Sequence, residues 1–399
     1  MKRINSAFVG YCLSILLVGT ATYSYSQSQK KNNVKFKKHT LTTDFISEGV
    51  AVGDVNKDKK TDIIAGAYWF EAPKWNRHEI FPGKTFNPAK EYSNSFLNLG
   101  QDVDQDGWVD LVLIDFPGKI GTWYKNPKNK TGHWQKYIIH DSVEISNESP
   151  NFVDVDGDGR LDILCADSKA KQMVWLQAPA KKGSVVWERF PISEKNTPNT
   201  QKFSHGLGMG DLNKDGRADV ITTEGWWEAP ANPKQPNWLF HPAILGERRS
   251  HMHAADVNGD GNMDVISASA HDYGICWHEQ IKDPQGNVSW KHHEFSKTIS
   301  QTHASSLTDI NKDGKPDLVT GKRFYAHMDT NKDPGVNDPA VLSWFEFTKE
   351  KKPLWIEHQI DNNSGAGLNI VTQDITKDGL TDIIVANKKG VFLFERIKK

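Results

Sequence analysis

The sequence predicts an all-β fold, a seven-bladed β-propeller, and three observations support this prediction. An acidic motif, Asp-x-Asp/Asn-x-Asp-Gly-x-x-Asp, recurs seven times, with its first Asp at positions 54, 102, 154, 211, 256, 309 and 374. Successive copies are 45 to 65 residues apart, which is the length scale of one propeller blade. Short alternating or apolar segments flank every copy, so each repeat supplies about four strands.

The four expected strands of a repeat have distinct residue patterns. The first contains small residues, as in 49–53 and 206–210, and the second is apolar, as in 62–65 and 264–267. The third carries Trp and often Glu, as in Trp69 with Glu71. The fourth carries Trp-x-x-His or a variant of it, as in Trp75 with His78. Because these Trp, Glu and His residues recur in most repeats, we assign them to packing between blades.

The two ends of the chain predict how the ring closes. The seventh repeat stops at 394–395 without a fourth strand, whereas 34–39 is a fourth-strand segment without a preceding repeat. Pairing the two segments completes the last blade and removes two exposed strand edges. We therefore expect one domain over residues 27–399.

Composition excludes two classes of protein. The chain has 399 residues, a formal net charge of -1 and a mean hydropathy of -0.60. A neutral chain lacks the excess of Lys and Arg needed to bind nucleic acid through bulk electrostatics. The low hydropathy, with one N-terminal apolar run, excludes a multi-pass membrane protein.

The N-terminus has the pattern of a secretory signal peptide. Lys2 and Arg3 precede an apolar stretch, 7–18, which is followed by polar residues. We expect cleavage near residue 26, so that 1–26 is the signal peptide of a bacterial protein that is secreted or periplasmic, with no membrane contact afterwards. Cys165 and Cys276 lie in different repeats, so we expect no disulfide between them.

The acidic motifs predict structural calcium sites. Carboxylates at alternating positions, with Gly at the sixth, form a tight loop whose oxygens converge on a hard cation. The flanking segments are strands, which distinguishes these loops from EF-hands. Lys59 at the Gly position and Thr376 at the third position weaken the first and seventh copies. The candidate ligands of the other five are Asp102, Asp104, Asp106, Asp110, Asp154, Asp156, Asp158, Asp162, Asp211, Asn213, Asp215, Asp219, Asp256, Asn258, Asp260, Asp264, Asp309, Asn311, Asp313 and Asp317.

Together, these repeats resemble the FG-GAP/VCBS repeat propellers over nearly the whole chain after the signal segment. A narrower resemblance lies in 204–211, 224–230, 321–327 and 333–335. These segments are similar to the propeller domain of aldos-2-ulose dehydratases and their secreted bacterial relatives. The resemblance implies an enzyme that eliminates water from sugars.

Strand order predicts where a site would lie. The acidic loops join first and second strands, so the starts of the first strands and the loops between second and third strands lie at the opposite end of the ring. His205, His251 and His303 start the first strands of three consecutive repeats. Three converging imidazoles suit zinc or another divalent metal with an open position, or general acid/base chemistry. The same end contributes Glu48, Glu148, Trp226, His271, Tyr273, Lys322, Arg323, Tyr325 and His327.

The resulting hypothesis is a carbohydrate dehydratase, a carbon–oxygen lyase acting on a sugar or a uronate-ended oligosaccharide. A base must take the proton next to a carbonyl or carboxylate, a cation must hold the enolate, and an acid must protonate the departing hydroxyl. His205, His251 or Tyr325 are the candidates for base and acid, with Glu48 and Glu148 in reserve. The enolate would be held by a metal, Lys322 or Arg323, and this basic pair favours an acidic substrate. Catalytic roles are also assigned to His303 and His327, and substrate contacts to Glu148, Trp226, His271 and Tyr273, with Trp226 and Tyr273 stacking on a sugar face.

Two alternatives remain open at this point. A calcium-stabilised propeller that binds glycans or proteins without catalysis would leave the axial histidines dispensable. A polysaccharide lyase would use the same elimination with a glycosidic leaving group.

Overall fold

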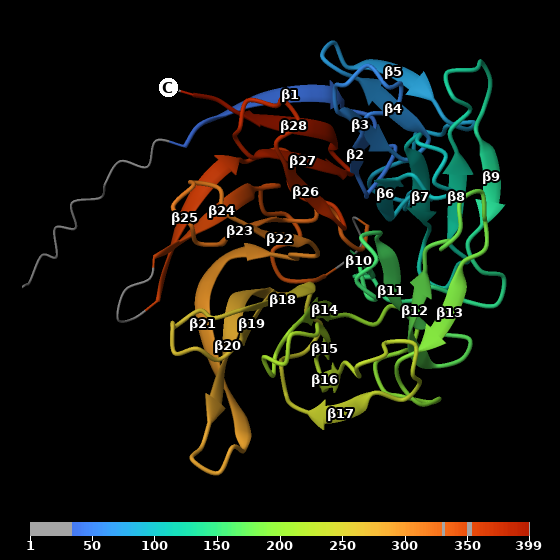
Figure 1. Ribbon diagram of the computed structural model, residues 1–399. Coiled ribbons are helices and arrows are strands. Elements are labelled where there is room, and N and C mark those ends of the chain that lie inside the picture. Colours follow the sequence, from blue (N-terminus) through green and yellow to red (C-terminus); the bar gives the residue numbers. More distant parts are fainter. Residues whose placement is uncertain (1–33, 329–331, 349–352, 399) are drawn as a thin grey trace, which may run out of the picture. The chain divides into compact units, whose positions relative to one another are not determined.

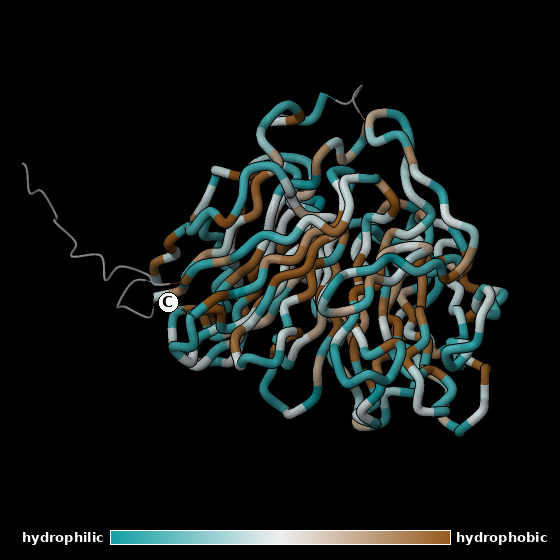
Figure 2. The backbone as a smooth tube through the Cα atoms, turned by 90° about the horizontal axis from the view of Figure 1, so that it is seen from above, coloured by the Kyte–Doolittle hydropathy of each residue, from teal (hydrophilic) through white to brown (hydrophobic). Residues whose placement is uncertain are grey.

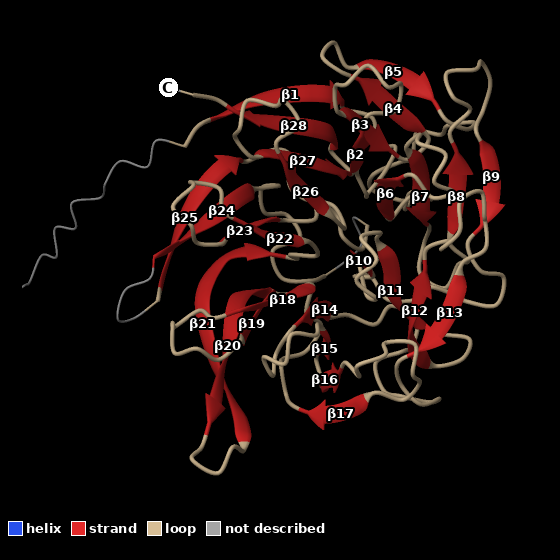
Figure 3. Ribbon diagram, viewed as in Figure 1, coloured by secondary structure: helices blue, strands red, loops and turns tan. Residues whose placement is uncertain are grey.

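Every regular element in the described part of the chain is a β-strand. The computed structural model describes residues 34–328, 332–348 and 353–398, and these residues fold into 28 strands and no helix (Figures 1 and 3). Accordingly, none of them forms a helix able to span a membrane. Contacts group 34–399 into one unit. The predicted signal segment, 1–26, lies outside the described residues.

Five sheets have four strands each, and within the unit they are arranged around a centre (Figure 1). Four follow chain order: β2 (Ala51–Gly53), β3 (Asp62–Ala65), β4 (Tyr68–Glu71), β5 (Asn76–Glu79); β6 (Leu97–Gln101), β7 (Asp110–Ile114), β8 (Thr122–Lys125), β9 (Gln135–Ile138); β10 (Asn151–Val153), β11 (Asp162–Asp167), β12 (Gln172–Gln177), β13 (Glu188–Pro191); and β22 (Ser305–Thr308), β23 (Asp317–Gly321), β24 (Leu342–Thr348), β25 (Leu354–Asp361).

The fifth four-stranded sheet joins the two ends of the described chain. It consists of β26 (Ile370–Gln373), β27 (Asp382–Asn387), β28 (Gly390–Arg396) and β1 (Phe36–Thr42). β1 runs antiparallel to β28, with Phe36 opposite Arg396 and His39 opposite Leu393. The predicted pairing of the N-terminal strand with the last repeat is confirmed.

The sixth sheet differs from the predicted seven separate blades. Its eight strands are β17 (Leu239–Pro242), β16 (Gly225–Glu228), β15 (Asp219–Thr222), β14 (Leu207–Gly210), β18 (His251–Ala255), β19 (Asp264–Ala268), β20 (Tyr273–Lys282) and β21 (Val288–Ser300). Two antiparallel meanders merge because their first strands, β14 and β18, pair in parallel. Gly208 permits this approach, since a Cβ there would lie 1.8 Å from the carbonyl oxygen of Met252. The described chain is therefore an all-β propeller built from six hydrogen-bonded sheets.

The core lies between neighbouring meanders. One cluster packs Leu164 and Trp175 of one sheet against Val220 and Trp227 of the next. Figure 2 shows the same distribution, with hydrophobic residues along the strands of the interior and hydrophilic residues on the loops. Burial of apolar faces between successive sheets supplies the main stabilisation of this architecture.

The last Asp of every acidic motif is a buried structural residue. All seven are fully buried: Asp62, Asp110, Asp162, Asp219, Asp264, Asp317 and Asp382. Asp219 shows the shared pattern, because one carboxylate oxygen accepts the amide of Leu212 at 2.9 Å and the other accepts the amide of Ala229 at 2.9 Å. The carboxylate therefore ties the start of the acidic loop to the end of the third strand.

Replacing this residue tests its structural role. Asp219→Ala should lower the free energy of unfolding by about 3 kcal/mol or more, because two buried amides lose an ionic acceptor. Urea denaturation in calcium-free buffer would measure the loss, with Asp215→Ala, an exposed position of the same loop, as the matched control with an effect of about 1 kcal/mol or less. Equal losses in the two variants would contradict this role.

Candidate functional site

A cavity of about 660 Å³ lies at the end of the sheets that the sequence predicted for the site. None of its lining residues belongs to an acidic loop. Segments that precede first strands supply Glu148 and His205, and loops between second and third strands supply Glu224 and His271. The full lining is Tyr92, Phe96, Phe116, Glu148, Asn199, Gln201, Phe203, Ser204, His205, Thr223, Glu224, Gly246, Glu247, Arg248, His271 and His327.

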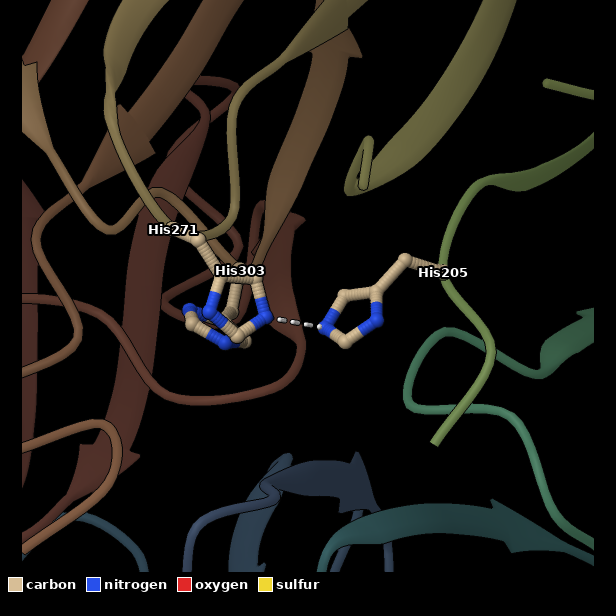
Figure 4. Close-up of side chains that lie close together, drawn as sticks. All are labelled: His205, His271 and His303. Carbon is tan, nitrogen blue, oxygen red and sulfur yellow. Dashed lines mark hydrogen bonds between the residues drawn. The ribbon is translucent and has the colours of Figure 1, made fainter. Parts of the chain in front are cut away.

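Three histidines converge beside this cavity. His205 precedes β14, His271 follows β19, and His303 precedes β22. Each offers a ring nitrogen within 4.8 Å of the other two, and the Nε2 atoms of His205 and His271 are 3.1 Å apart (Figure 4). Two nitrogen ligands of a tetrahedral zinc lie about 3.3–3.4 Å apart, given zinc–nitrogen bonds of about 2.0–2.1 Å. The spacing therefore fits a shared metal ion.

Hydrogen bonds at Nδ1 fix the orientation of these rings. Nδ1 of His205 donates to the carbonyl of Phe203 at 2.8 Å, and Nδ1 of His303 donates to the carbonyl of Gln301 at 3.1 Å. Nδ1 of His271 lies 3.1 Å from a carboxylate oxygen of Asp333. In the neutral ring, each of these donors leaves Nε2 as a lone pair, so the lone pairs of His205 and His271 face each other. A cation between them would relieve that repulsion, and a carboxylate behind the ligand is the usual support of a metal-binding histidine.

The third nitrogen supports the same interpretation. Nε2 of His303 is buried and has no hydrogen-bond partner among the described residues. It lies 3.6 Å from a carboxylate oxygen of Glu148, and Nε2 of His205 lies 3.8 Å from that oxygen. A buried lone pair without a donor is costly unless a cation or water occupies it. His205, His271 and His303 are thus the residues that could hold a metal ion, and Glu148 lies beside them.

Burial keeps the imidazoles neutral. It lowers the pKa of His205 and of His327 to about 4, and it lowers the pKa of His303 well below its usual value. The pKa of His271 is lowered by burial and by the neighbouring His205. Neutral imidazole is the form that binds metals.

Behind the histidines, a fully buried arginine bridges two buried glutamates. Arg323 donates from Nε to Glu48 and from Nη1 to Glu148, both at 3.1 Å. Glu48 precedes β2, Glu148 precedes β10 and Arg323 follows β23, so this ion network connects segments of three different sheets. Burial raises the pKa of Glu148, whereas the charge of Arg323 opposes that rise.

The structure corrects several predicted site assignments. His251 is buried at the β14–β18 junction and does not line the cavity, so His271 takes its place beside His205 and His303. Trp226 stacks on His241 with ring centroids 4.0 Å apart, as a blade-packing residue. Lys322 donates to the carbonyl of Gly335 instead of facing the cavity.

Two predicted tyrosines also lie outside the cavity lining. The hydroxyl of Tyr273 donates to Asp338, and the ring of Tyr325 packs on Phe324. By contrast, Glu148, His271 and His327 do line the cavity, as the sequence predicted for this end of the ring.

Sequence reasoning missed two features of the site. One is Asp333, whose carboxylate contacts Nδ1 of both His271 and His327, at 3.1 and 3.0 Å. The other is an aromatic wall in which Phe116 and the 42% exposed Phe203 meet edge to face. The sequence offered one indication that Asp333 belongs to the site, namely that it lies only six residues after His327 in the chain. Phe203 precedes the His205 segment, but no repeat pattern marked it.

The acidic loops also have a definite geometry. In the second repeat, Asp102, Asp104 and Asp110 each offer an oxygen within 4.8 Å of the others. Among the described residues, buried carboxylate oxygens without a hydrogen-bond partner occur at Asp54, Asp104, Asp106 and Asp156. Lys125 contacts Asp104 and Asp106, so an ammonium already lies in the second loop.

Removing the buried arginine tests the ion network. Arg323→Met should lower the free energy of unfolding by about 3–5 kcal/mol, since Glu48 and Glu148 would be buried without their countercharge. Urea denaturation at neutral pH would measure this, and adding Glu48→Gln to the same variant should restore part of the loss. A loss below about 1 kcal/mol in the free energy of unfolding would show that the ion pairs of Arg323 with Glu48 and Glu148 are exposed to solvent.

Comparisons with known proteins support the repeat assignment. FG-GAP-like repeats match residues 102–165, 154–222 and 256–320. No curated protein matches the chain.

Solved structures with similar folds share little sequence with the chain. BBS1N, crystallised in complex with ARL6DN, has a TM-score of 0.53 at 10% identity and covers 92% of this chain and 97% of its own. A lectin from Agrocybe aegerita that recognises non-reducing terminal N-acetylglucosamine has a TM-score of 0.44 at 14% identity, covering 83% and 81%. The extracellular domain of a hybrid two-component system protein from B. thetaiotaomicron has 0.45 at 13% identity, covering 90% and 41%. At these identities the likeness concerns the fold alone, and the chain is an all-β propeller that contains FG-GAP-like repeats.

Proposed function

We propose that this protein is a metal-assisted carbohydrate dehydratase whose active site is the cavity beside His205, His271 and His303. The observation that carries the proposal is the convergence of three neutral imidazoles, two with opposed Nε2 atoms 3.1 Å apart, next to buried Glu148. The resemblance of 204–211, 224–230, 321–327 and 333–335 to aldos-2-ulose dehydratases supports the reaction type. A bound divalent metal would supply Lewis-acid polarisation of a substrate oxygen.

Glu148 is the proton-transfer group in this proposal. It lines the cavity, and burial raises its pKa, which favours a carboxyl group that can carry the proton it transfers. It takes the proton from the carbon next to the substrate carbonyl, the C–H electron pair forms the new double bond, and the adjacent C–O bond breaks. The same proton then reaches the departing hydroxyl, which leaves as water. Arg323 holds the carboxylate in position at 3.1 Å.

The ion network removes Lys322 and Arg323 as partners of the uronate expected from the sequence, which leaves Arg248 as the basic residue of the cavity lining. Arg323 is balanced by two carboxylates, and Lys322 is engaged with Gly335, so neither offers a free cation to an acidic substrate. The aromatic wall of Phe116 and Phe203 offers an apolar surface to a sugar face.

An activity assay with matched variants tests the proposal. Dehydration of a panel of keto sugars and uronate-ended oligosaccharides should create a conjugated double bond that is visible as new ultraviolet absorbance. Glu148→Gln should lower kcat by about 10²–10⁴-fold while the protein retains its bound metal. His358→Ala, in a blade-packing pair with Glu346, is the control with wild-type kcat. If no sugar of the panel produced new absorbance and none changed the Tm, the proposal that this protein is a dehydratase would be refuted.

A non-catalytic glycan-binding propeller is the second candidate, and the exposed ring of Phe203 is the observation that favours it. In that case Phe203→Ala would abolish glycan binding, whereas His271→Ala would leave it intact. In the dehydratase, His271→Ala would abolish turnover as well as metal retention.

We also propose that the acidic loops bind calcium and that the eight-stranded sheet acts as two blades of a seven-bladed ring. Carboxylate oxygens without partners at Asp104 and Asp156 support the first point, and the two meanders joined only at β14 and β18 support the second. The proposed environment, outside the cytoplasm, would supply millimolar calcium.

Chelation tests the calcium proposal. Removing calcium should lower Tm by several degrees, because each site occupied at 100 times its Kd contributes about 2.7 kcal/mol. Asp156→Ala should reduce the calcium-induced rise in Tm. Asp58→Ala should not, since the first loop carries Lys59 at the Gly position and Asp58 is paired with Lys60. An unchanged melting curve after chelation would contradict calcium binding.

A further inference from the structure

A second group of metal-ligating side chains lies in the β20–β21 hairpin, apart from the cavity residues. Cys276, His278 and His292 each offer a ligand atom within 4.8 Å of the other two. Cys276 and His278 are two residues apart on β20, so both point to the same face of the strand. His292 lies directly opposite His278 on β21.

Comparison among the repeats shows that this group is an exception. His278 pairs with Val265, the residue that follows the buried Asp of its motif. The equivalent position in the six other repeats carries a large buried side chain of aromatic or aliphatic type: Phe70, Tyr124, Leu176, Trp227, Phe345 and Phe394. Packing of the blade therefore does not require a polar residue here, yet His278 is only 3% exposed.

The usual histidine role in a repeat is already filled by a different residue. His293 stacks on Trp277 and contacts Glu279 at 2.7 Å, as His78 does with Trp69 and Glu71. His278 and His292 are additional to that pattern. A buried histidine at a position that the other repeats fill with apolar or aromatic side chains needs another explanation.

The polar atoms of the group are poorly satisfied by the protein. Nδ1 of His278 is buried and has no hydrogen-bond partner among the described residues. A ring nitrogen of His278, Nε2, lies 3.3 Å from Nδ1 of His292, which matches the separation of about 3.3–3.4 Å between two nitrogen ligands of tetrahedral zinc. The thiol of Cys276 has a single distant contact, 3.7 Å from the hydroxyl of Ser267.

We propose that Cys276, His278 and His292 form a second metal site, which binds a thiophilic divalent ion of the zinc type. One thiolate and two imidazoles are a ligand set that zinc uses with a fourth position for water. Glu294 lies opposite Cys276 across the hairpin. Because His292 is exposed, the ion can enter from solvent at the β21 side.

Cobalt titration of the full chain under reducing conditions tests this site, because thiolate-bound Co²⁺ has a near-ultraviolet charge-transfer band that histidine-bound Co²⁺ lacks. The wild-type protein should show the band, and Zn²⁺ in excess over both proposed metal sites should remove it. Cys276→Ser should abolish it, whereas Cys165→Ser, at the other buried free cysteine, should retain it. His271→Ala should also retain it, which separates this site from the cavity.

A surface variant covers the risk that Cys276→Ser disturbs the fold. His292→Ala changes an exposed side chain, so the Tm should stay unchanged. Co²⁺ binding, followed by the charge-transfer band, should weaken by at least about tenfold. Absence of the band in the wild-type protein, or its survival in folded Cys276→Ser, would overturn the proposal. The outcome does not depend on the activity proposed for the cavity.

Discussion

The structure depends on one buried carboxylate that recurs in every repeat. At the end of each acidic motif, an Asp with no exposed surface accepts the amide of the residue that follows the first Asp of the motif. Its second oxygen accepts an amide at the end of the third strand. Since a buried ionic acceptor is costly to leave unpaired, this contact fixes the register of three strands and the path of the loop together. The opposite end of each sheet can then vary in sequence.

At the acidic end, the side chains around the loop are matched in charge. In three of the repeats with Asn at the third loop position, a Glu on the third strand accepts from it: Glu71 from Asn56, Glu279 from Asn258 and Glu346 from Asn311. In the other such repeat, Asn213 donates to Asp215. Where that position is Asp, the third strand supplies a donor, Lys125 in one repeat and Gln177 in another. Loops with Asn and loops with Asp at this position thus differ in local charge, which we expect to give them different affinities for a cation.

At the opposite end, burial and ion pairing determine the chemistry. Four histidines have lowered pKa values because they are buried near Arg323 or near one another, so they are neutral ligands or bases and not cations. Arg323 in turn is neutralised by Glu48 and Glu148. Lys322 and Arg323 therefore do not form the predicted positive patch, and Arg248 is the basic residue that lines the cavity.

By itself, the sequence determined the repeat, the strand order, the ring closure and the end at which the site lies, because these follow from local spacing and from alternation along strands. It also placed His205, His303 and Glu148 at that end. Only the tertiary structure decided that His271 joins them while His251 lies in a strand junction, since that choice depends on the parallel pairing of β14 with β18. Only the tertiary structure likewise placed Asp333 behind His271 and His278 next to His292. Contacts between segments far apart in the chain, or across a strand pair, depend on loop paths and register, which no single repeat encodes.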